Sequence, residues 1–457
     1  MLEDLKRTCL GLLIFAFIVA IDQPAYGIPA FARKYGLRCS ACHEAWPKLN
    51  NFGQVFKDNG YQLMNDRDSP IWQNVSYFPV SIRVTPQWHR ENTNRMALDQ
   101  TPGVVSSHLT EANITTSGFD LSGLDLWTAG TLYKNISFSV LPSFDADGTF
   151  HFENTWVRFD NLLKSPWLNF KLGKFELDIP DSEKRILTLS QNGGTFQVYH
   201  YRPLTGDINT FGGIGDNQLG IELMGHSRNS YTRYAISLTS SNDGQPGLPT
   251  NSGYDLYGDV SQAWEWGSLG LQRVGTLAYY GHSPTYFLTL DGVPIPGTGR
   301  GNQPFYRFGA YGDWHVHKWL FNTTYLRGKD NAFLGTGTSA NQPLPPGAQG
   351  PIWNGGFVET DYYWNPQLVL VGRYDLVRME NQAFPIGTTL PNGVPLAADY
   401  GNTDAGVVGF RWYPIMTSRV GLALQTEFAR VRIRGAAPVT GRDLSTNSFL
   451  MGFDFAF

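Results

Sequence analysis

The connections between the extended segments of this chain constrain its fold more than any single segment does, because they alternate in length along nearly the whole sequence. Short turns such as Lys134-Asn135, His317-Lys318 and Asn365-Pro366 alternate with long loops rich in glycine, proline and asparagine, among them 284–304 and 380–401. Outer-membrane β-barrels have this asymmetry, with short periplasmic turns and longer outer loops. The sequence therefore predicts an all-β, outer-membrane barrel with both termini on the side of the short turns.

Sixteen extended segments supply the strands of this predicted porin-like barrel. Most contain the 9–11 residues that a tilted strand needs to cross an outer membrane. A barrel with this number of strands is wide enough for an aqueous channel. The segments are Tyr77–Trp88, Asp120–Tyr133, Ile136–Phe144, Phe150–Leu162, Leu168–Asp178, Asn217–Gly225, Tyr231–Ser240, Gly253–Glu265, Leu269–Gly281, Phe305–His315, Trp319–Gly328, Gly355–Trp364, Leu368–Val377, Asp404–Tyr413, Arg419–Arg430 and Asn447–Phe457.

The last segment shows most clearly which residues face lipid. Phe449, Met451, Phe453, Phe455 and Phe457 alternate with residues that are mostly small or polar. Successive side chains of a strand point to opposite faces of the sheet. The pattern therefore predicts that this apolar set contacts membrane lipid and that its neighbours face the lumen.

The tryptophans beside the short turns follow a second membrane pattern. Trp314, Trp319, Trp364 and Trp412 each lie close to one of these turns. Aromatic girdles mark the two interfaces of an outer-membrane barrel, so we expect these side chains at the periplasmic interface.

Composition excludes several other classes of protein. Charged residues make up 16% of the 457 residues and aromatic residues 14%, with 50 glycines and 27 prolines, which is unlike a disordered chain. A helical membrane protein would need several apolar runs of about 20 residues, and the one extended apolar run is at the extreme N-terminus. The net charge of -4 does not indicate a nucleic-acid partner. A soluble β-sandwich or propeller is the alternative, although no blade-length repeat occurs.

Residues 1–27 have the pattern of a cleaved signal peptide. Lys6 and Arg7 precede an apolar stretch from Leu10 to Ile21, and Ala25-Tyr26-Gly27 offers small residues for cleavage. The mature chain would then begin at Ile28. A retained anchor is the alternative, but the apolar run is short for a membrane span.

The strongest chemical signal is the run Cys39-Ser40-Ala41-Cys42-His43. C-x-x-C-H is the attachment signature of a c-type haem. Its two thiols add to the two porphyrin vinyl groups, and the adjacent histidine is placed under the iron as proximal ligand. A thioredoxin-like dithiol would need an α/β surround, and a zinc half-site would need two more ligands nearby. The sequence therefore predicts one covalent haem c on Cys39 and Cys42, with His43 as its proximal ligand.

Residues 28–69 form the predicted cytochrome segment, and residues 70–457 form the barrel. The segment is expected to contain one short helix from Pro29 to Tyr35 and a second from Lys48 to Asn59. A segment this small cannot enclose a haem by itself, so another part of the protein must cover the second haem face. The apolar face expected against the porphyrin consists of Leu49, Phe52, Val55 and Phe56.

The sequence offers a choice for the sixth ligand of the haem iron. Histidine and methionine are the common axial ligands, and methionine raises the potential. Met64 is the only methionine of the cytochrome segment, whereas His200, His89 and His151 are the alternatives from the barrel. An open site is the third possibility.

The N-terminal region resembles that of the fused monohaem cytochrome–porins of iron-oxidising bacteria. The similarity runs from Ile28 to His43 and continues through Trp46-Pro47-Lys48-Leu49-Asn50, Phe52-Gly53, Phe56-Lys57 and Asn59-Gly60-Tyr61. The rest of the chain matches the family only in architecture and length. The resemblance implies an outer-membrane Fe(II):cytochrome c oxidoreductase. Such a protein takes electrons from extracellular Fe(II) and passes them to a periplasmic c-type cytochrome or another soluble carrier.

Three functions are compatible with these patterns. The first is oxidation of extracellular Fe(II), and the second is electron exchange with another extracellular donor or acceptor. The third is a solute porin whose haem is structural. Carboxylates in one long connection suit a hard cation such as Fe(II), or they form a solvated acidic loop; they are Asp178, Asp181, Glu183 and Asp207.

Overall fold

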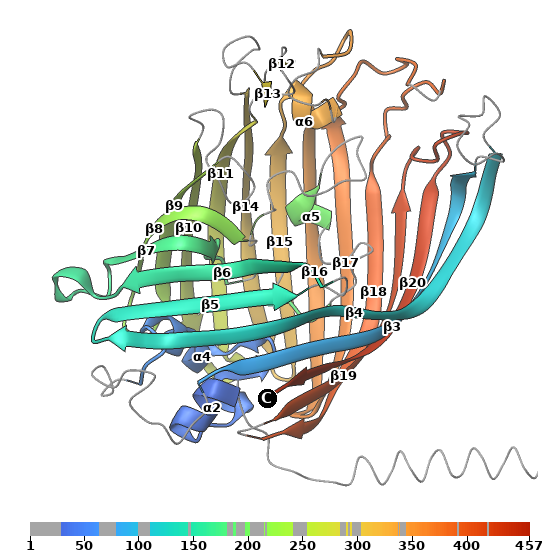
Figure 1. Cartoon of the computed structure of the whole chain (residues 1–457). Coiled ribbons are helices and arrows are strands. Elements are labelled where there is room, and N and C mark those ends of the chain that lie inside the picture. The colour runs from blue at the N-terminus through green and yellow to red at the C-terminus, as the bar shows by residue number, and fades with distance from the viewer. Residues whose placement is uncertain are drawn as a thin grey trace, which may run out of the picture.

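The computed structural model of this protein is a closed barrel of 16 antiparallel strands with a small helical segment at one end (Figure 1). No helix in the described part of the chain is long and apolar enough to cross a bilayer. The predicted signal peptide lies outside the described residues. The structure describes residues 29–63, 79–98, 110–144, 148–180, 186–188, 197–201, 214, 217–240, 254–283, 289–290, 293–294, 303–336, 338, 344–390, 393–417 and 420–457.

All sixteen predicted segments correspond to barrel strands. Each strand pairs with its neighbours in the chain, and the last strand closes the barrel on the first. The barrel strands are β3 (Ser81–Leu98), β4 (Thr110–Tyr133), β5 (Ile136–Phe144), β6 (Phe150–Phe159), β7 (Asn169–Glu176), β8 (Asn217–His226), β9 (Thr232–Ser240), β10 (Tyr254–Glu265), β11 (Leu271–Ser283), β14 (Gln303–Val316), β15 (Trp319–Lys329), β16 (Ile352–Asn365), β17 (Leu368–Asn381), β18 (Thr403–Met416), β19 (Gly421–Ile433) and β20 (Leu444–Ala456). The smaller elements outside the barrel wall are η1 (Leu162–Lys164), α5 (Gln197–His200), η2 (Gly267–Leu269), β12 (Thr289–Leu290), β13 (Val293–Pro294) and α6 (Ala332–Thr336).

The first two barrel strands are longer than the sequence predicts. The β3–β4 ladder extends as far as the pair Leu98 and Thr110. This extension runs through polar residues such as Asn92 and Thr115, whose side chains hydrogen-bond across the strands at 2.7 Å. The number of residues needed to cross the membrane does not predict such an extension.

The prediction of turn order is confirmed. The strand pairings place the short turns 134–135, 317–318 and 366–367 at the end of the barrel where β3 begins and β20 ends. Figure 1 shows the C-terminus at this end and the long connections at the other. We call these the short-turn end and the long-loop end.

The predicted facing of the side chains is also confirmed. In β20, Phe449, Met451 and Phe453 are exposed on the outer surface, while Leu450 and Asp454 are buried towards the lumen. A closed barrel with such an outward apolar surface is the architecture of outer-membrane barrels.

The expected aromatic girdle is supported by two of its four tryptophans near the short-turn end, whereas Trp314 and Trp412 are half-buried. Trp319 and Trp364 are exposed there. Both rings contact Tyr362, at centroid distances of 4.5 Å and 6.3 Å.

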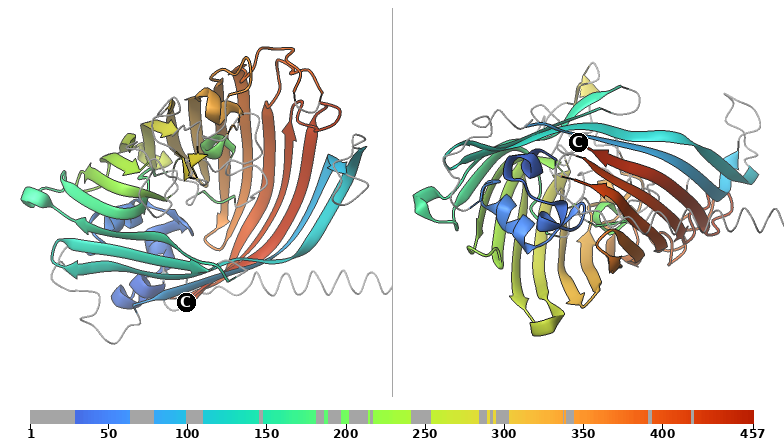
Figure 2. Two further views of the ribbon diagram at one scale, coloured as in Figure 1. Left: turned by 45° about the horizontal axis from the view of Figure 1, so that its top comes forward. Right: turned by 90° about the horizontal axis from the view of Figure 1, so that it is seen from below.

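The helical segment lies inside the ring of strands at the short-turn end (Figure 2). It consists of α2 (Pro29–Tyr35), α3 (Cys39–Cys42), β1 (His43–Ala45), β2 (Lys48–Leu49) and α4 (Asn51–Asp58). The first helix has the predicted bounds, but the second begins at Asn51 rather than Lys48. Asn50 caps α4 by accepting a 2.9 Å hydrogen bond from the backbone N–H of Gly53, and Lys48–Leu49 instead pairs with β1. The cap, and not the apolar periodicity, therefore sets the start of the helix.

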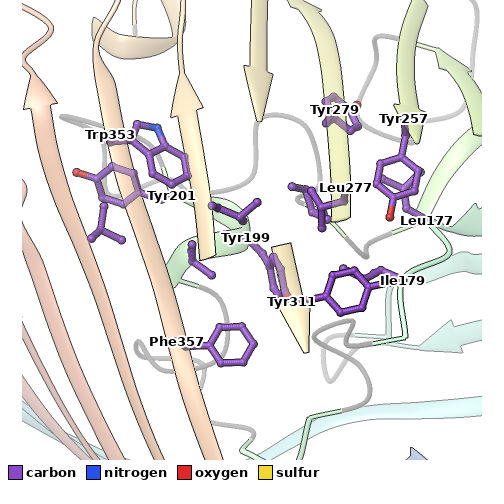
Figure 3. Close-up of a cluster of buried hydrophobic side chains, with 14 of the residues drawn as sticks. Leu177, Ile179, Tyr199, Tyr201, Tyr257, Leu277, Tyr279, Tyr311, Trp353 and Phe357 are labelled. Carbon is purple, nitrogen blue, oxygen red and sulfur yellow. The ribbon is translucent and has the colours of Figure 1, made fainter. Parts of the chain in front are cut away.

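The connection between β7 and β8 also enters the lumen. Leu177, Ile179 and Tyr199 from this connection are buried against inward-facing residues of the barrel wall such as Tyr257 and Phe357 (Figure 3). The described part of this connection forms a hydrophobic cluster inside the barrel. The helical segment and the described part of this connection therefore both occupy the lumen.

Candidate functional site

The C-x-x-C turn is held in shape by α4. Cys39 and Cys42 are the ends of a single helical turn, and they are not joined in a disulfide. The side-chain amide of Asn50 donates to the carbonyl of Ala41 at 3.0 Å, and the backbone N–H of Asn50 donates to the carbonyl of Cys42 at 2.9 Å. A Cβ at Gly53 would lie 2.1 Å from the carbonyl oxygen of Cys42, so only glycine permits this close approach.

The protonation of Cys42 argues against a thioredoxin-like dithiol. Burial raises the pKa of the Cys42 thiol to about 11. Redox-active dithiols have a lowered thiol pKa, because the thiolate is the reactive form. The thiol of Cys42 is thus neutral at pH 7.

His43 is oriented with one ring nitrogen satisfied and the other available. Its side chain is only 5% exposed. Nδ1 lies 3.1 Å from the carbonyl oxygen of Pro47, to which it donates in the tautomer that leaves Nε2 unprotonated. Nε2 is buried and has no hydrogen-bond partner among the described residues. A metal-bound histidine has this arrangement, since its second nitrogen is held by a carbonyl or carboxylate.

Burial also keeps the imidazole of His43 neutral. Desolvation lowers its pKa to about 4, although the backbone carbonyls of Pro47 and Lys48 act in the opposite direction. Only the neutral imidazole has a lone pair for a metal ion. His43 is therefore ready to coordinate across the ordinary pH range.

A large cavity opens beside Cys42 and His43, between the helical segment and the wall formed by β4 to β8. Its empty volume is ≈ 1420 Å³, part of which is open solvent. The segment contributes Phe56 and Tyr61, and the barrel contributes Trp127, Trp156 and Phe175. The rings of Tyr61 and Trp156 stack at 6.2 Å, so that aromatic walls from two parts of the chain meet here.

These residues fit a covalently attached haem. Cys42 and His43 line this cavity, which is large and mostly apolar, as cofactor sites are. Cys39, at the other end of the turn, packs in a separate buried cluster with Leu187 and Val369. Arg38 and Lys57 also line the cavity and suit the propionate groups of a porphyrin. Two further lining cations are already paired, Arg158 with Asp160 and Lys171 with Glu222. A haem bound here would supply one-electron chemistry at its iron.

Ion pairs and hydrogen bonds fix the helical segment to the barrel wall. Asp58, at the end of α4, accepts hydrogen bonds of 2.8 Å and 2.9 Å from Arg233 of β9. Arg233 also pairs with Asp178 at 2.6 Å. Lys48 donates to Asp313 at 3.1 Å from the other side of the segment. The barrel therefore covers the segment and its cavity, as a segment of this size requires.

The position of Asp178 corrects one expectation from the sequence. It does not present a carboxylate to an outer cation, because it is buried in the lumen and paired with Arg233 and Lys57. Asp181, Glu183 and Asp207 lie outside the described residues. No group of three or more potential metal ligands occurs in the part of the chain that the structure describes.

The prediction for the apolar face of α4 is partly wrong. Phe56 lines the cavity, but Phe52 is 44% exposed and faces away from it. Leu49 lines the cavity as predicted, whereas Val55 is not among its described lining residues, and Gly53 lies beside Cys42. The helix is turned by its packing against the C-x-x-C turn, which the periodicity alone does not reveal.

The candidates for the second axial ligand are distributed as follows. Met64 lies outside the described residues, and the side chain of His200 is not described. His89 and His151 lie on β3 and β6 and are not among the described residues that line the cavity.

Sequence reasoning missed Met224. This inward-facing residue of β8 is 3% exposed and lines the same cavity. Among the described lining residues, it is the only one besides Cys42 and His43 that has a sulfur or imidazole ligand. Its sulfur lies 3.8 Å from Nη1 of Arg158. The signal was its inward position on a strand, but only the fold places that strand beside the C-x-x-C turn.

Comparison with known proteins supports the fold alone. No family model and no curated protein matches the chain. The anion-selective porin from Comamonas acidovorans is 12% identical with a TM-score of 0.50, covering 83% of this chain and 99% of that one. The outer membrane channel DcaP of Acinetobacter baumannii is 12% identical with a TM-score of 0.47, covering 83% and 97%. OmpT of Vibrio cholerae is 10% identical with a TM-score of 0.46, covering 83% and 100%. The chain thus has a porin-like barrel.

Proposed function

We propose that this protein is an outer-membrane electron-transfer cytochrome–porin that oxidises extracellular Fe(II). Each Fe(II) loses one electron, and one molecule of a periplasmic c-type cytochrome or another soluble carrier gains it. The single haem c is attached to Cys39 and Cys42 and held by His43. The long-loop end faces the outside, and the helical segment faces the periplasm.

The observation that carries this proposal is the state of His43. A buried imidazole nitrogen without a partner is costly, because a polar group removed from water needs a hydrogen bond or a ligand. In this chain, that nitrogen belongs to a C-x-x-C-H turn and lies beside a large aromatic cavity. Iron coordination satisfies the nitrogen, and the cavity accommodates the porphyrin.

Under this proposal, a residue of the cavity wall would supply a second ligand for the haem iron. Met224 lies on β8, whereas His43 belongs to the helical segment. Ligation by both would join the segment to the barrel through one iron. A thioether ligand also raises the potential of a c-type haem, as oxidation of Fe(II) requires.

The filled lumen favours electron transfer over solute diffusion. The helical segment lies inside the barrel at the short-turn end, and the hydrophobic cluster around Tyr199 lies further along the lumen. Leu187, which belongs to the same connection as that cluster, packs in one group with Cys39. Electrons need no open passage, whereas solutes do. The iron assignment itself rests on the family resemblance, and another extracellular donor is the second candidate.

Reconstitution in sealed liposomes tests the proposal. Vesicles containing the whole protein would enclose an oxidised soluble c-type cytochrome, with Fe(II) supplied outside under anaerobic conditions. We expect one enclosed cytochrome to be reduced for each Fe(II) oxidised. A Cys39→Ala/Cys42→Ala variant should not support the reaction, whereas Ser40→Ala, in the same turn, should.

Two results would contradict the proposal. If the double cysteine variant reduces the enclosed cytochrome as fast as the wild type, Fe(II) passes through the barrel as a solute. If an organic donor reduces the enclosed cytochrome and Fe(II) does not, the second candidate function is correct.

A further inference from the structure

A group of arginines lies on the outer surface of the barrel at the long-loop end, far from the candidate haem site. Arg430 and Arg432 belong to β19, and their side chains alternate with the buried Ala429 and Val431. Arg95 of β3 and Arg442 of the β19–β20 connection join them around a hollow with an empty volume of ≈ 830 Å³, including open solvent. These four residues are called the arginine cluster below.

The charges of this cluster are not balanced by the carboxylates around it. Asp443 accepts from Arg432 and, at 3.0 Å, from Arg434. Glu111 lies 4.0 Å from Arg95. Counting Arg434, five guanidinium groups face two carboxylates. The exposed side chains of Arg430 and Arg442 have no ion-pair partner among the described residues.

A third carboxylate beside the cluster does not neutralise it. Asp404 of β18 is the cross-strand neighbour of Arg432. It already pairs with Arg378, and it accepts a 2.7 Å hydrogen bond from the hydroxyl of Tyr374. The net positive charge of the hollow therefore persists.

An apolar surface lies directly towards the membrane from this hollow. On the same outward face of β19, Phe428 lies next to Arg430 on the side of the short-turn end. The neighbouring strand β20 presents Phe449 opposite Phe428, and Met451 lies further towards the short-turn end. The arrangement places cations above side chains that contact acyl chains. It matches an amphiphile with an anionic headgroup and several acyl chains.

We propose that the arginine cluster binds the phosphorylated glucosamine headgroup of lipid A, the glycolipid of the outer leaflet. Guanidinium groups recognise phosphate through paired, charge-assisted hydrogen bonds. Phe428, Phe449 and Met451 contact the acyl chains of the same molecule. The inference relies on the orientation given under the proposed function but not on the haem, so it fails or holds separately from the electron-transfer assignment.

Lipid binding to the purified, haem-loaded protein tests this site. Native mass spectrometry would count lipid molecules retained after titration with bis-phosphorylated lipid A. We expect one tightly held molecule. Arg430→Gln/Arg442→Gln should weaken its binding about 25-fold, since each interfacial arginine contributes about a factor of five. Arg228→Gln/Arg327→Gln removes the same charge elsewhere on the protein and should change the affinity less than twofold.

Competitor arms identify the source of the phosphate. Inorganic phosphate and dephosphorylated lipid A should each fail to displace the bound molecule. Displacement by inorganic phosphate would identify a free-anion site and overturn the proposal. Equal losses in the two double variants, or no loss in either, would also overturn it. Heat-modified gel mobility verifies that each variant forms the barrel, and the single variant Arg430→Gln gives an intermediate affinity if the site is correct.

Discussion

The ion pair between Asp58 and Arg233 offers a quantitative test of how the helical segment is held in the lumen. Asp58 is 1% exposed and is also hydrogen-bonded by Gln54 at 2.9 Å. Desolvation raises the pKa of Asp58, but the charge of Arg233 outweighs it, and the net pKa is well below the usual range. Asp58→Asn removes the charge with little change of shape. Removing one partner of a buried ion pair costs about 3–5 kcal/mol. Because Arg233 keeps Asp178 as a partner, we expect the helical segment to be bound in the lumen about 3 kcal/mol less tightly, which is about 150-fold in the equilibrium between bound and released segment.

Single-channel recording in planar bilayers measures this change, because the docked segment obstructs the lumen. We expect open events to be about 150-fold more probable in Asp58→Asn than in the wild type. Asp404→Asn breaks an exposed ion pair with Arg378, worth about 0–1 kcal/mol, and should leave the channel closed. A closed Asp58→Asn channel, or an open Asp404→Asn channel, would refute the reasoning about the docked segment.

Three further predictions concern the cavity. Met224→Leu should retain covalent haem but lower the reduction potential of that haem and abolish any sulfur-to-iron absorption band. The control Met451→Leu, on the lipid face, should change neither property. An unchanged potential in Met224→Leu would show that Met224 is not a ligand. Since burial lowers the pKa of His43 from 6.5 to about 4, unfolded chains bind more protons within that window. In urea denaturation of the haem-free protein, acidification from pH 7 to pH 4 should therefore cost the wild type up to about 3 kcal/mol more stability than it costs His43→Gln, and equal losses would contradict the burial of His43. Gly53→Ala should lower the free energy of unfolding by about 1–3 kcal/mol and reduce haem loading, because the new Cβ would overlap the carbonyl of Cys42. In the control Gly372→Ala, the new Cβ enters open space. Equal melting temperatures of the two variants would show that the turn is not tightly packed.

The strand order of the barrel follows from local information in the sequence. Alternating residues and short turns specify each hairpin separately, and a closed barrel results when every strand pairs with its neighbour. The exposed Phe449 and the buried Asp454 show that the same local rule also assigns the two faces. Several strands are longer than predicted, and the difference is largest in β3 and β4, because their outer ends are mostly polar.

Only part of the candidate site could be predicted from the sequence, and the reason is physical. Cys39, Cys42 and His43 form a contiguous motif, so their chemistry is evident without the fold. Met224 has no such motif, and its place in the lining of the cavity that His43 also lines depends on how the barrel wall meets the segment. Asp178 was assigned to an outer loop because loops usually run over the surface, whereas this connection turns into the lumen and pairs with Arg233.

The most direct test of the account is anaerobic addition of one equivalent of Fe(II) to the purified, oxidised protein while its visible spectrum is recorded. We expect the spectrum of a reduced c-type haem to appear. Acidified organic solvent should then fail to extract the haem, because Cys39 and Cys42 hold it covalently. If Fe(II) leaves the oxidised spectrum unchanged while dithionite reduces the same sample, the protein does not oxidise Fe(II), and the central claim is contradicted.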